Sequence, residues 1–203
     1  MITLLDYGGS NLRSVQKAFE FVGAPVEVTA DPQVVFQAKK LVLPGVGAFG
    51  AGIAALRQRG LDAAVGEAVG RGILLLGICL GMQFLFDESD EMGRHRGLGL
   101  IRGQVQRLDP RPSSLKVPHV GWNEINHDGS HPLLRSVPGG AHAYFVHSYY
   151  CRPANAENVL AQTDYGRSFA SIVGRDNVYG IQFHPEKSQK VGLQILRNFV
   201  EMA

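Results

Sequence analysis

One cysteine lies between two glycines where a strand-like run meets a helix-like run. The segment 70–86 reads GRGILLLGICLGMQFLF, with Cys79 between Gly77 and Gly81. A sharp strand-to-helix turn exposes one side chain above a sheet edge, and its strained backbone needs small neighbours. The following helix N-terminus favours a thiolate, and the N–H of Leu80 is left free to stabilise an oxyanion. We expect Cys79 to be a nucleophile; a buried structural thiol is the alternative.

A histidine and a carboxylate could complete this chemistry. A thiolate nucleophile needs a histidine as base, and the histidine needs an acceptor. His184 follows an apolar run and precedes Pro185 and Glu186, and the proline makes a rigid corner. Glu186 can then fix the imidazole tautomer and stabilise its charged form. The sequence predicts a Cys79–His184–Glu186 triad, and the alternative is a surface histidine followed by a helix-capping carboxylate.

A glycine-rich turn is expected to supply further oxyanion donors. The strand-like run at 41–43 ends in a turn containing Gly45, Val46 and Gly47. Parallel strands end at the same sheet edge, so this turn should lie beside the cysteine. The same glycines, with Gly50, match the G-x-G-x-x-G dinucleotide pattern. That alternative needs an acidic residue at the end of the next strand, where this chain has Cys79.

The elements that must position these residues alternate in the first half of the chain. Short apolar runs predict strands at 2–5, 26–29, 41–43 and 73–78. Helices are predicted over 12–22 with Ser10 or Asn11 as N-cap, after Asp31, and between 48 and 70 around Gly60. Unalternating apolar runs joined by helices are typical of a parallel sheet covered on both faces. The expected class is α/β with a mostly parallel central sheet.

The second half has a different pattern. Strand-like pieces lie at 99–108, 116–125, 143–151, 158–165, 168–175 and 177–184, separated by turn residues. This spacing predicts antiparallel hairpins added to the edge of the sheet. A last helix is expected over 188–202. No linker or repeat interrupts the pattern, so we expect one domain over residues 1–203.

Composition narrows the functional classes. The 203 residues carry a net charge of +2, with no basic run that would indicate nucleic-acid binding. Two cysteines make no disulfide framework, and no signal or membrane-spanning run is present, so we expect a cytoplasmic protein. His127 and His131 have i,i+4 spacing, but Gly129 and Pro132 argue against a helix, and no metal site is predicted. Cys151 is expected to be inert.

Five motifs, some of which contain the residues discussed above, follow one another along the chain. They are PGVGAFG (44–50), GICLGMQ (77–83), PHVGWN (118–123), YFVHSYY (144–150) and GIQFHPEKS (180–188). Together they resemble class I (triad) glutamine amidotransferases. The opening DYGGSNLRSV and the central HVGWN resemble, within that family, the glutaminase subunits of imidazole glycerol phosphate synthase. The opening turn usually reads D-Y-G-x-G-N there, whereas this chain has Gly9 and Ser10, so its first loop should differ in detail.

The resemblance implies a mechanism and a partner. Cys79 would attack the carboxamide of glutamine without a cofactor, with Gln83, Ser148 and Tyr149 holding the amino-acid end of the substrate. The ammonia would pass to a (β/α)8-barrel cyclase subunit that makes imidazole glycerol phosphate and an aminoimidazole carboxamide ribotide. The implied interface residues are Asn11, Trp122, Asn123 and Lys187. Glycines around Val46 would let the oxyanion turn rest misdirected and reorient on activation.

Three other functions remain open from the residues. A stand-alone cysteine hydrolase of the elbow type would act on an ester or peptide without a partner. A non-catalytic module could keep the elbow cysteine as a redox sensor, although it would need no His-Pro-Glu corner. A glutaminase subunit of another synthase, such as the one feeding pyridoxal phosphate synthesis, is a nearer rival, which PGVGAFG and HVGWN fit poorly.

Overall fold

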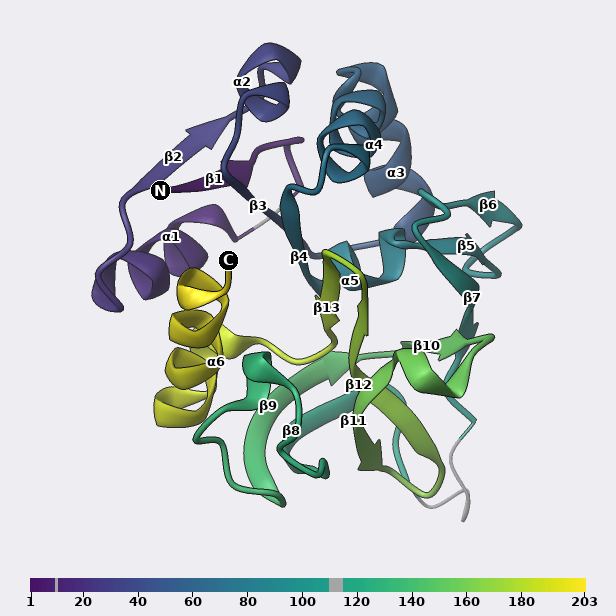
Figure 1. The fold of residues 1–203 in the computed structure, drawn as a ribbon. Helices are drawn as coiled ribbons and strands as arrows, with labels where there is room; N and C mark the ends of the chain where they lie inside the picture. Colours follow the sequence, from purple (N-terminus) through teal and green to yellow (C-terminus); the bar gives the residue numbers. More distant parts are fainter. Residues whose placement is uncertain (10, 110–114) are drawn as a thin grey trace.

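A computed structural model describes residues 1–9, 11–109 and 115–203, and its central feature is a twisted seven-stranded sheet (Figure 1). In spatial order its strands are β11 (Val159–Asp164), β12 (Ser168–Arg175), β13 (Val178–Ile181), β4 (Leu74–Cys79), β3 (Lys40–Gly45), β1 (Ile2–Leu5) and β2 (Val26–Thr29). Neighbouring strands from β2 to β13 are parallel to one another. At the other edge β12 is antiparallel to β13, and β11 is antiparallel to β12. The expected mostly parallel sheet with an antiparallel extension is confirmed.

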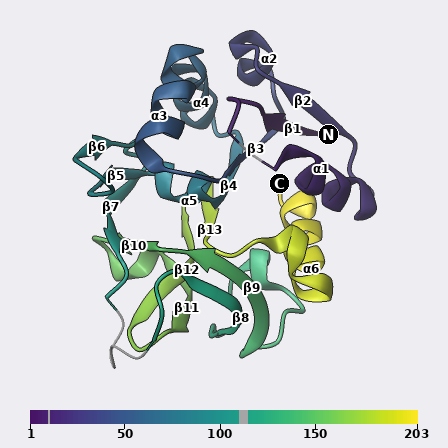
Figure 2. The same ribbon diagram turned by 180° about the vertical axis from the view of Figure 1, so that it is seen from behind.

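Helices cover both faces of this sheet (Figures 1 and 2). On one face lie α1 (Leu12–Phe21) and α6 (Gln189–Glu201); on the other lie α2 (Pro32–Phe36), α3 (Phe49–Gln58), α4 (Leu61–Gly70) and α5 (Leu80–Phe84). Every residue of β1, β4 and β13 is buried, because a strand between two helical layers has no solvent-facing side. This burial explains the unalternating apolar runs of the sequence.

Several helix boundaries follow from local chemistry, as the sequence predicts. The Asp31 side chain accepts a hydrogen bond from the backbone N–H of Gln33 at 2.9 Å, which caps α2. Gly60 has φ +67° and separates α3 from α4. Asn11 is the N-cap residue of α1 but makes no side-chain capping bond. Ser10, the other predicted cap, lies outside the described residues.

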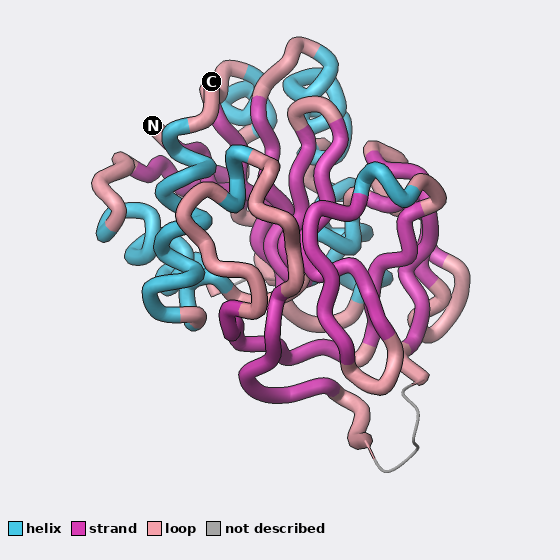
Figure 3. The backbone as a smooth tube through the Cα atoms, turned by 60° about the horizontal axis from the view of Figure 1, so that its bottom comes forward, coloured by secondary structure: helices cyan, strands magenta, loops and turns pink. Residues whose placement is uncertain are grey.

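The remaining strands form two smaller sheets, one beside α5 and the other at the lower end of the molecule in Figure 1. One contains β10 (Tyr149–Pro153), β7 (Ile101–Arg107), β5 (Phe86–Ser89) and β6 (His95–Arg96); the other pairs β8 (His119–Ile125) with β9 (Ala141–His147). The described residues also form short 3-10 helices: η1 (Pro132–Leu134), η2 (Ala156–Asn158) and η3 (Pro185–Lys187). Figure 3, turned to bring this end forward, shows that strands make up most of it.

Two details of the predicted second half are wrong. Of its strand-like pieces, only β11 and β12 extend the sheet edge as an antiparallel hairpin. The run containing β13 lies inside the sheet, parallel to β4, because a short apolar run fits either strand direction and its partner is chosen by distant packing. The apolar segment after Cys79 also changes from helix to strand, since α5 ends at Phe84 and β5 begins at Phe86.

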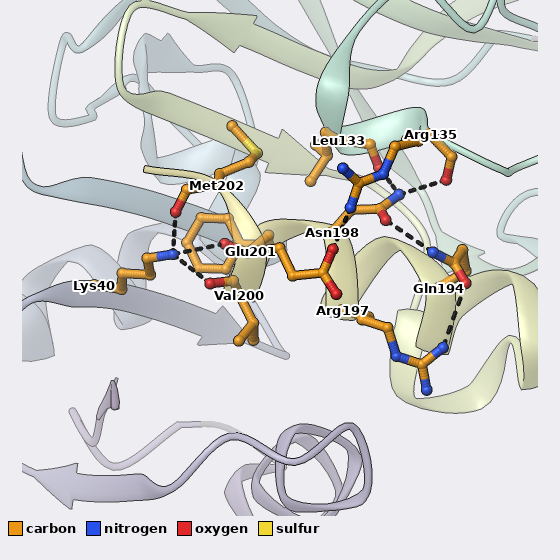
Figure 4. A network of polar contacts seen from close by, with 10 residues as sticks. Lys40, Leu133, Arg135, Gln194, Arg197, Asn198, Val200, Glu201 and Met202 are labelled. Atoms are coloured by element: carbon orange, nitrogen blue, oxygen red, sulfur yellow. Dashed lines mark hydrogen bonds and ion pairs between the residues drawn. The ribbon is translucent and has the colours of Figure 1, made fainter.

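The C-terminal helix is tied to the start of β3. The Nζ of Lys40 donates to three carbonyl oxygens at the end of α6, those of Phe199, Val200 and Met202 (Figure 4). These carbonyls belong to the last turn of a helix, where no N–H of the helix can reach them. The lysine therefore links the C-terminus of α6 to the strand that carries the Gly45–Gly47 turn at its other end.

Among the residues that the structure describes, none of the helices combines the length and the apolar character that crossing a bilayer requires.

Candidate functional site

Cys79 occupies a strained turn between β4 and α5. Its backbone has φ +56° and ψ −111°, and the helix begins at the next residue. Positive φ is uncommon for a non-glycine residue and marks a position that its surroundings hold in place. The side chain lines a cavity of about 420 Å³. The backbone is that of the elbow which the sequence predicts.

The two glycines around the cysteine allow three backbone segments to meet. A Cβ placed on Gly81 would collide with the backbone carbonyl of Leu43 on β3. A Cβ on Gly77 would come within 2.6 Å of the carbonyl oxygen of Gly81. Contacts this close to backbone atoms cannot be relieved by rotating a side chain. The glycines therefore let α5 pack directly against β3 and β4, which fixes the height of Cys79 above the sheet.

Replacing Gly81 by Ala should test this packing. We expect Gly81→Ala to lower the free energy of unfolding by about 3 kcal/mol, because β3 and α5 must separate to admit the methyl group. Chemical denaturation would measure the loss. Gly66 is the matched control, because it lies in the helix α4 and an added Cβ meets no atom within 4 Å. Equal stabilities for Gly81→Ala and Gly66→Ala would show that the close approach is not needed.

The predicted triad residues come together at this cavity. His184 follows β13 and begins the turn η3, which carries Glu186. The Nδ1 of His184 donates to Oε1 of Glu186 at 2.8 Å, and these side chains are only 5% and 1% exposed. With Nδ1 bonded to the carboxylate, Nε2 is the nitrogen left to meet the Cys79 thiol, whose interaction with the imidazole contributes to raising the pKa of His184. The order Cys79, His184, Glu186 matches a nucleophile, a base and its orienting acid.

The charge balance at His184 favours the protonated ring. Burial by itself would lower the pKa of His184, but the hydrogen bonds with Cys79 and Glu186 and their negative charges raise it to about 10. An imidazolium beside the sulfur stabilises a thiolate, which is the reactive form of cysteine. The structure therefore places a protonated imidazole beside the predicted nucleophile.

Most of the predicted site residues line this cavity. Cys79, His184, Val46, Gly47, Leu80, Gln83, Ser148, Tyr149 and Lys187 all line it. Gly45 is buried at the end of β3, and Glu186 lies behind His184. Asn11, Trp122 and Asn123 are not among the lining residues. The lining residues that the sequence analysis missed are Glu91, Pro118, Val146 and His147.

The turn at Gly45–Gly47, which is the predicted oxyanion turn, has at least one backbone N–H that is not free to bind an oxyanion. The N–H of Val46 donates to the carbonyl of Gly9 at 3.2 Å and so is already engaged. The N–H of Leu80, in the first turn of α5, has no acceptor within its own helix. Gly47 has φ +97°, a conformation that favours glycine. Gly50 packs against the ring of His95, so the three glycines of the dinucleotide-like pattern do not form one open loop.

The polar groups of the cavity suit an amino acid. The Nε2 of Gln83 donates to the carbonyl of Tyr149 at 3.1 Å and to Oε1 of Gln182 at 3.3 Å, so its own carbonyl oxygen is left as an acceptor. Glu91 accepts from the N–H of Phe49 at 2.6 Å through Oε2, which leaves Oε1. Two acceptors in one cavity match the ammonium group of a free amino acid.

The backbone of Tyr149 offers a donor. Just before β10, the carbonyl of Ser148 accepts from the N–H of Leu108, and at the start of β10 Tyr149 pairs with Arg107 of β7. Bonded and non-bonded pairs alternate along an antiparallel ladder, so the N–H and C=O of Tyr149 face away from β7. The carbonyl accepts from Gln83, and the N–H on the same side can bind a carboxylate.

Two buried histidines beside the cavity were not found from the sequence. His119 and His147 face each other across the β8–β9 pair, and the Nδ1 of His119 lies 3.0 Å from the Nε2 of His147. Burial lowers the pKa of His119 to about 4 and that of His147 to about 3. Both rings are therefore neutral at physiological pH. In the sequence both histidines lie inside strand-like pieces, within the motifs PHVGWN and YFVHSYY, and nothing there indicates that the two rings meet.

These histidines make the fold sensitive to acid. Between pH 6.5 and about 3 the unfolded chain binds protons at His119 and His147 that the folded chain does not. The free energy of unfolding should therefore fall as the pH drops through this window, by up to ~1.4 kcal/mol per pH unit for one histidine. Urea unfolding at a series of pH values would measure the slope. His147→Asn should reduce it, whereas replacing the exposed His142 should not; equal slopes in both variants would contradict the assignment.

The predicted interface residues divide into two groups. Trp122 is 47% exposed, its ring meets that of Tyr144 edge-on, and the Nζ of Lys187 lies 5.8 Å above the Tyr144 ring. Trp122 is thus a surface residue and not a core tryptophan. Asn123 stays a predicted interface residue, and its side chain is half-buried. Successive strand residues point to opposite faces, and its amide donates to the carbonyl of Asp164 at 2.8 Å and bonds to His119.

Comparison with known proteins places the chain in a family. The model of the family "Glutamine amidotransferase class-I" matches residues 3–203. Proteins named imidazole glycerol phosphate synthase subunit HisH are 52% identical in Syntrophotalea carbinolica, covering all of both chains, and 50% identical in Moorella thermoacetica, covering 99% of this chain and 94% of the relative.

Solved structures show the same fold. A glutamine amidotransferase crystal structure has a TM-score of 0.77 at 21% identity, covering 98% of this chain and 97% of the other. The structure of PurLQS from Thermotoga maritima also has a TM-score of 0.77, at 20% identity, covering 98% and 96%. The chain therefore belongs to the class I glutamine amidotransferase family, and within it to the group of imidazole glycerol phosphate synthase HisH subunits.

Proposed function

We propose that this chain hydrolyses glutamine to glutamate and ammonia and delivers the ammonia to a cyclase partner in histidine biosynthesis. The partner would use it to make imidazole glycerol phosphate and an aminoimidazole carboxamide ribotide. The observation that carries the proposal is the Cys79–His184–Glu186 arrangement at a cavity with acceptors for an ammonium group. The names of the full-length relatives support the same activity. We also propose that residues 1–203 act as one amidotransferase domain.

The triad would work through a covalent intermediate. The Cys79 thiolate attacks the side-chain carbonyl carbon of glutamine, and the C=O bond opens to an oxyanion. His184 gives its proton to the leaving nitrogen, so ammonia departs and a γ-glutamyl thioester remains. The same imidazole then takes a proton from water, which attacks the thioester and releases glutamate. Glu186 stabilises the imidazolium in both halves of the reaction.

The other end of the substrate would be held by the polar groups of the cavity. The free oxygens of Gln83 and Glu91 would bind the α-ammonium group, and the N–H of Tyr149 would bind the α-carboxylate. Ser148 lies next to these groups in the lining. This arrangement fixes the amino-acid end, so that only a side chain of suitable length places its carbonyl at the sulfur.

The partner would cover the rim of the cavity. Trp122, Val120 and Val146 are exposed hydrophobic residues of the β8–β9 pair, and Val146 also lines the cavity together with Lys187. An exposed tryptophan among other exposed hydrophobic residues is typical of a protein contact. We propose that a (β/α)8-barrel cyclase docks here and receives the ammonia, because ammonia lost to water would be protonated. Asn11 is the proposed contact at the start of α1. Two free cysteines support the cytoplasm as the proposed location.

The oxyanion turn would keep the enzyme inactive without its partner. The N–H of Val46 is held by the carbonyl of Gly9, so this donor does not point at the oxyanion, whereas the N–H of Leu80 has no acceptor within its own helix. Rotation of the peptide between Gly45 and Val46 would release the N–H toward the substrate, and the adjacent glycines make that rotation inexpensive. One missing oxyanion donor costs about 10²-fold or more in kcat.

A glutaminase assay tests the proposed function and the resting turn together. We expect the chain alone to release glutamate at least about 10²-fold more slowly than its complex with the cyclase and ribotide. Co-purification would establish the complex, and glutamate release with and without ribotide would be measured. Full activity of the isolated chain would contradict the resting turn. Hydrolysis of esters or peptides in place of glutamine would favour a stand-alone cysteine hydrolase.

A further inference from the structure

The two buried histidines belong to a chain of hydrogen bonds that ends at the substrate cavity. The Nδ1 of His147 lies 2.9 Å from the carbonyl oxygen of Tyr149. The Nδ1 of His119 lies 3.0 Å from the Nε2 of His147, and the Nδ2 of Asn123 lies 3.3 Å from the Nε2 of His119. No step of the proposed hydrolysis uses either imidazole.

The direction of every bond in this chain is fixed. A carbonyl can only accept, so the Nδ1 of His147 carries its proton and, in a neutral ring, the Nε2 accepts. His119 must then donate from Nδ1, and its own Nε2 accepts from the amide of Asn123. The same amide nitrogen donates its second hydrogen to the carbonyl of Asp164 at 2.8 Å. Both histidines are thereby held as Nδ1–H tautomers.

The rings have little freedom to leave these positions. His119 and His147 are 2% and 6% exposed. The ring of His119 stacks on those of Tyr165 and Phe145, with centroids 4.0 and 4.9 Å away. The ring of His147 lies 5.1 Å from that of Phe169. The low pKa of His147, caused by its burial, keeps the ring neutral as the chain of bonds requires.

The end point of the chain is a backbone group at the free edge of β10. The Tyr149 carbonyl accepts from His147 and also from Gln83, at 2.9 and 3.1 Å. Two donors from opposite parts of the structure restrict rotation of this backbone segment. The N–H of Tyr149 faces the same side, so fixing the carbonyl also fixes the donor that would receive the substrate carboxylate.

We propose that His147, held in its Nδ1–H tautomer by His119, is a positioning residue for glutamine binding through the backbone of Tyr149. The inference rests on the proposed function, because it assumes that the cavity binds glutamine. It assigns these residues a role in substrate affinity and none in bond making. Removing the His147 donor should therefore weaken glutamine binding.

The test measures tautomers and affinity separately, in the full-length chain. Long-range ¹H–¹⁵N correlation spectra should show both histidines as Nδ1–H tautomers. Glutamine titrations would use Cys79→Ala as the parent, since it binds without turnover. His147→Leu should raise the Kd about tenfold. His147→Asn keeps a donor near the Nδ1 position and should restore most of the affinity. His119→Phe keeps the stacking, and should loosen the His147 tautomer and raise the Kd several-fold.

Several results would overturn the inference. They are an Nε2–H tautomer at His147, an unchanged Kd in His147→Leu, or unchanged tautomer and Kd in His119→Phe. If His147→Leu does not fold, His147→Asn and His119→Phe decide the question alone. Equal losses in His147→Leu and His147→Asn would indicate a purely structural role. A parent that binds no glutamine would contradict the proposed function itself, and the inference would fall with it, even with the expected tautomers.

Discussion

Cys79→Ala should abolish glutamine hydrolysis while the complex still makes its product from added ammonia. Loss of a nucleophile in a triad lowers kcat by about 10⁴-fold or more. The reason is local, because the sulfur is the only atom of this side chain that can form the thioester. Alanine keeps the Cβ at the strained φ of +56°, so the free energy of unfolding should change little. Glutamate release and ammonia-dependent synthesis would be measured side by side.

The matched control is the second cysteine. Cys151 is fully buried on β10, and burial raises the pKa of its thiol well above the usual value. Cys151→Ala should leave glutamate release within a few-fold of the parent. An alanine at position 79 that still releases glutamate would place the nucleophile elsewhere. Loss of ammonia-dependent synthesis in the same variant would indicate that it damages the complex and not only the hydrolysis.

His184→Asn should produce the second large effect. The asparagine amide can still donate to Glu186, so the buried carboxylate keeps a partner, but the nitrogen that faces the sulfur is lost. General acid–base catalysis contributes about 10²- to 10⁴-fold, and kcat should fall by that amount. Steady-state kinetics would measure the loss, with KM for glutamine expected to change much less.

The same variant makes a prediction about pH. The protonated His184, with its pKa raised by Cys79 and Glu186, stabilises the neighbouring thiolate. Without it, alkylation of Cys79 by iodoacetamide should need a more alkaline pH. Glu186→Gln should shift the alkylation profile in the same direction by a smaller amount, because the imidazole remains but loses its charged partner. An unchanged profile in His184→Asn would show that the imidazole does not activate the sulfur.

The geometry of the proposed catalytic centre could be predicted because each part of it has a local cause. The two glycines around Cys79 indicate the sharp turn, and the proline after His184 indicates the rigid corner. Both follow strands that the structure shows to be parallel neighbours, which brings them to one sheet edge. The family motifs around Gln83 and Tyr149 added residues that the cavity does contain.

The missed parts depend on contacts between distant segments. Nothing in the run 177–184 shows that β13 pairs in parallel with β4, because the choice depends on a neighbour about a hundred residues away. Glu91 reaches the cavity only because it bonds to the start of α3. The His119–His147 contact depends on the register of β8 against β9.

The predicted interface residues Trp122 and Asn123 do not share one face of the molecule. They are adjacent in the chain, and the resemblance implies an interface role for both. The structure places them on a strand, where alternation sends neighbouring side chains to opposite faces. Trp122 and Asn123 both remain proposed contacts, and the amide of Asn123 also bonds to the carbonyl of Asp164 and to the ring of His119.

Covalent trapping with a glutamine-analogue electrophile tests the central claim most directly. The reagent carries the amino-acid end of glutamine and a reactive carbon in place of the amide, so a cavity that binds glutamine will present that carbon to its nucleophile. Peptide mass spectrometry should find one label, on Cys79, and excess glutamine should slow its formation. A label on Cys151, or a label at Cys79 whose rate glutamine does not change, would contradict the account.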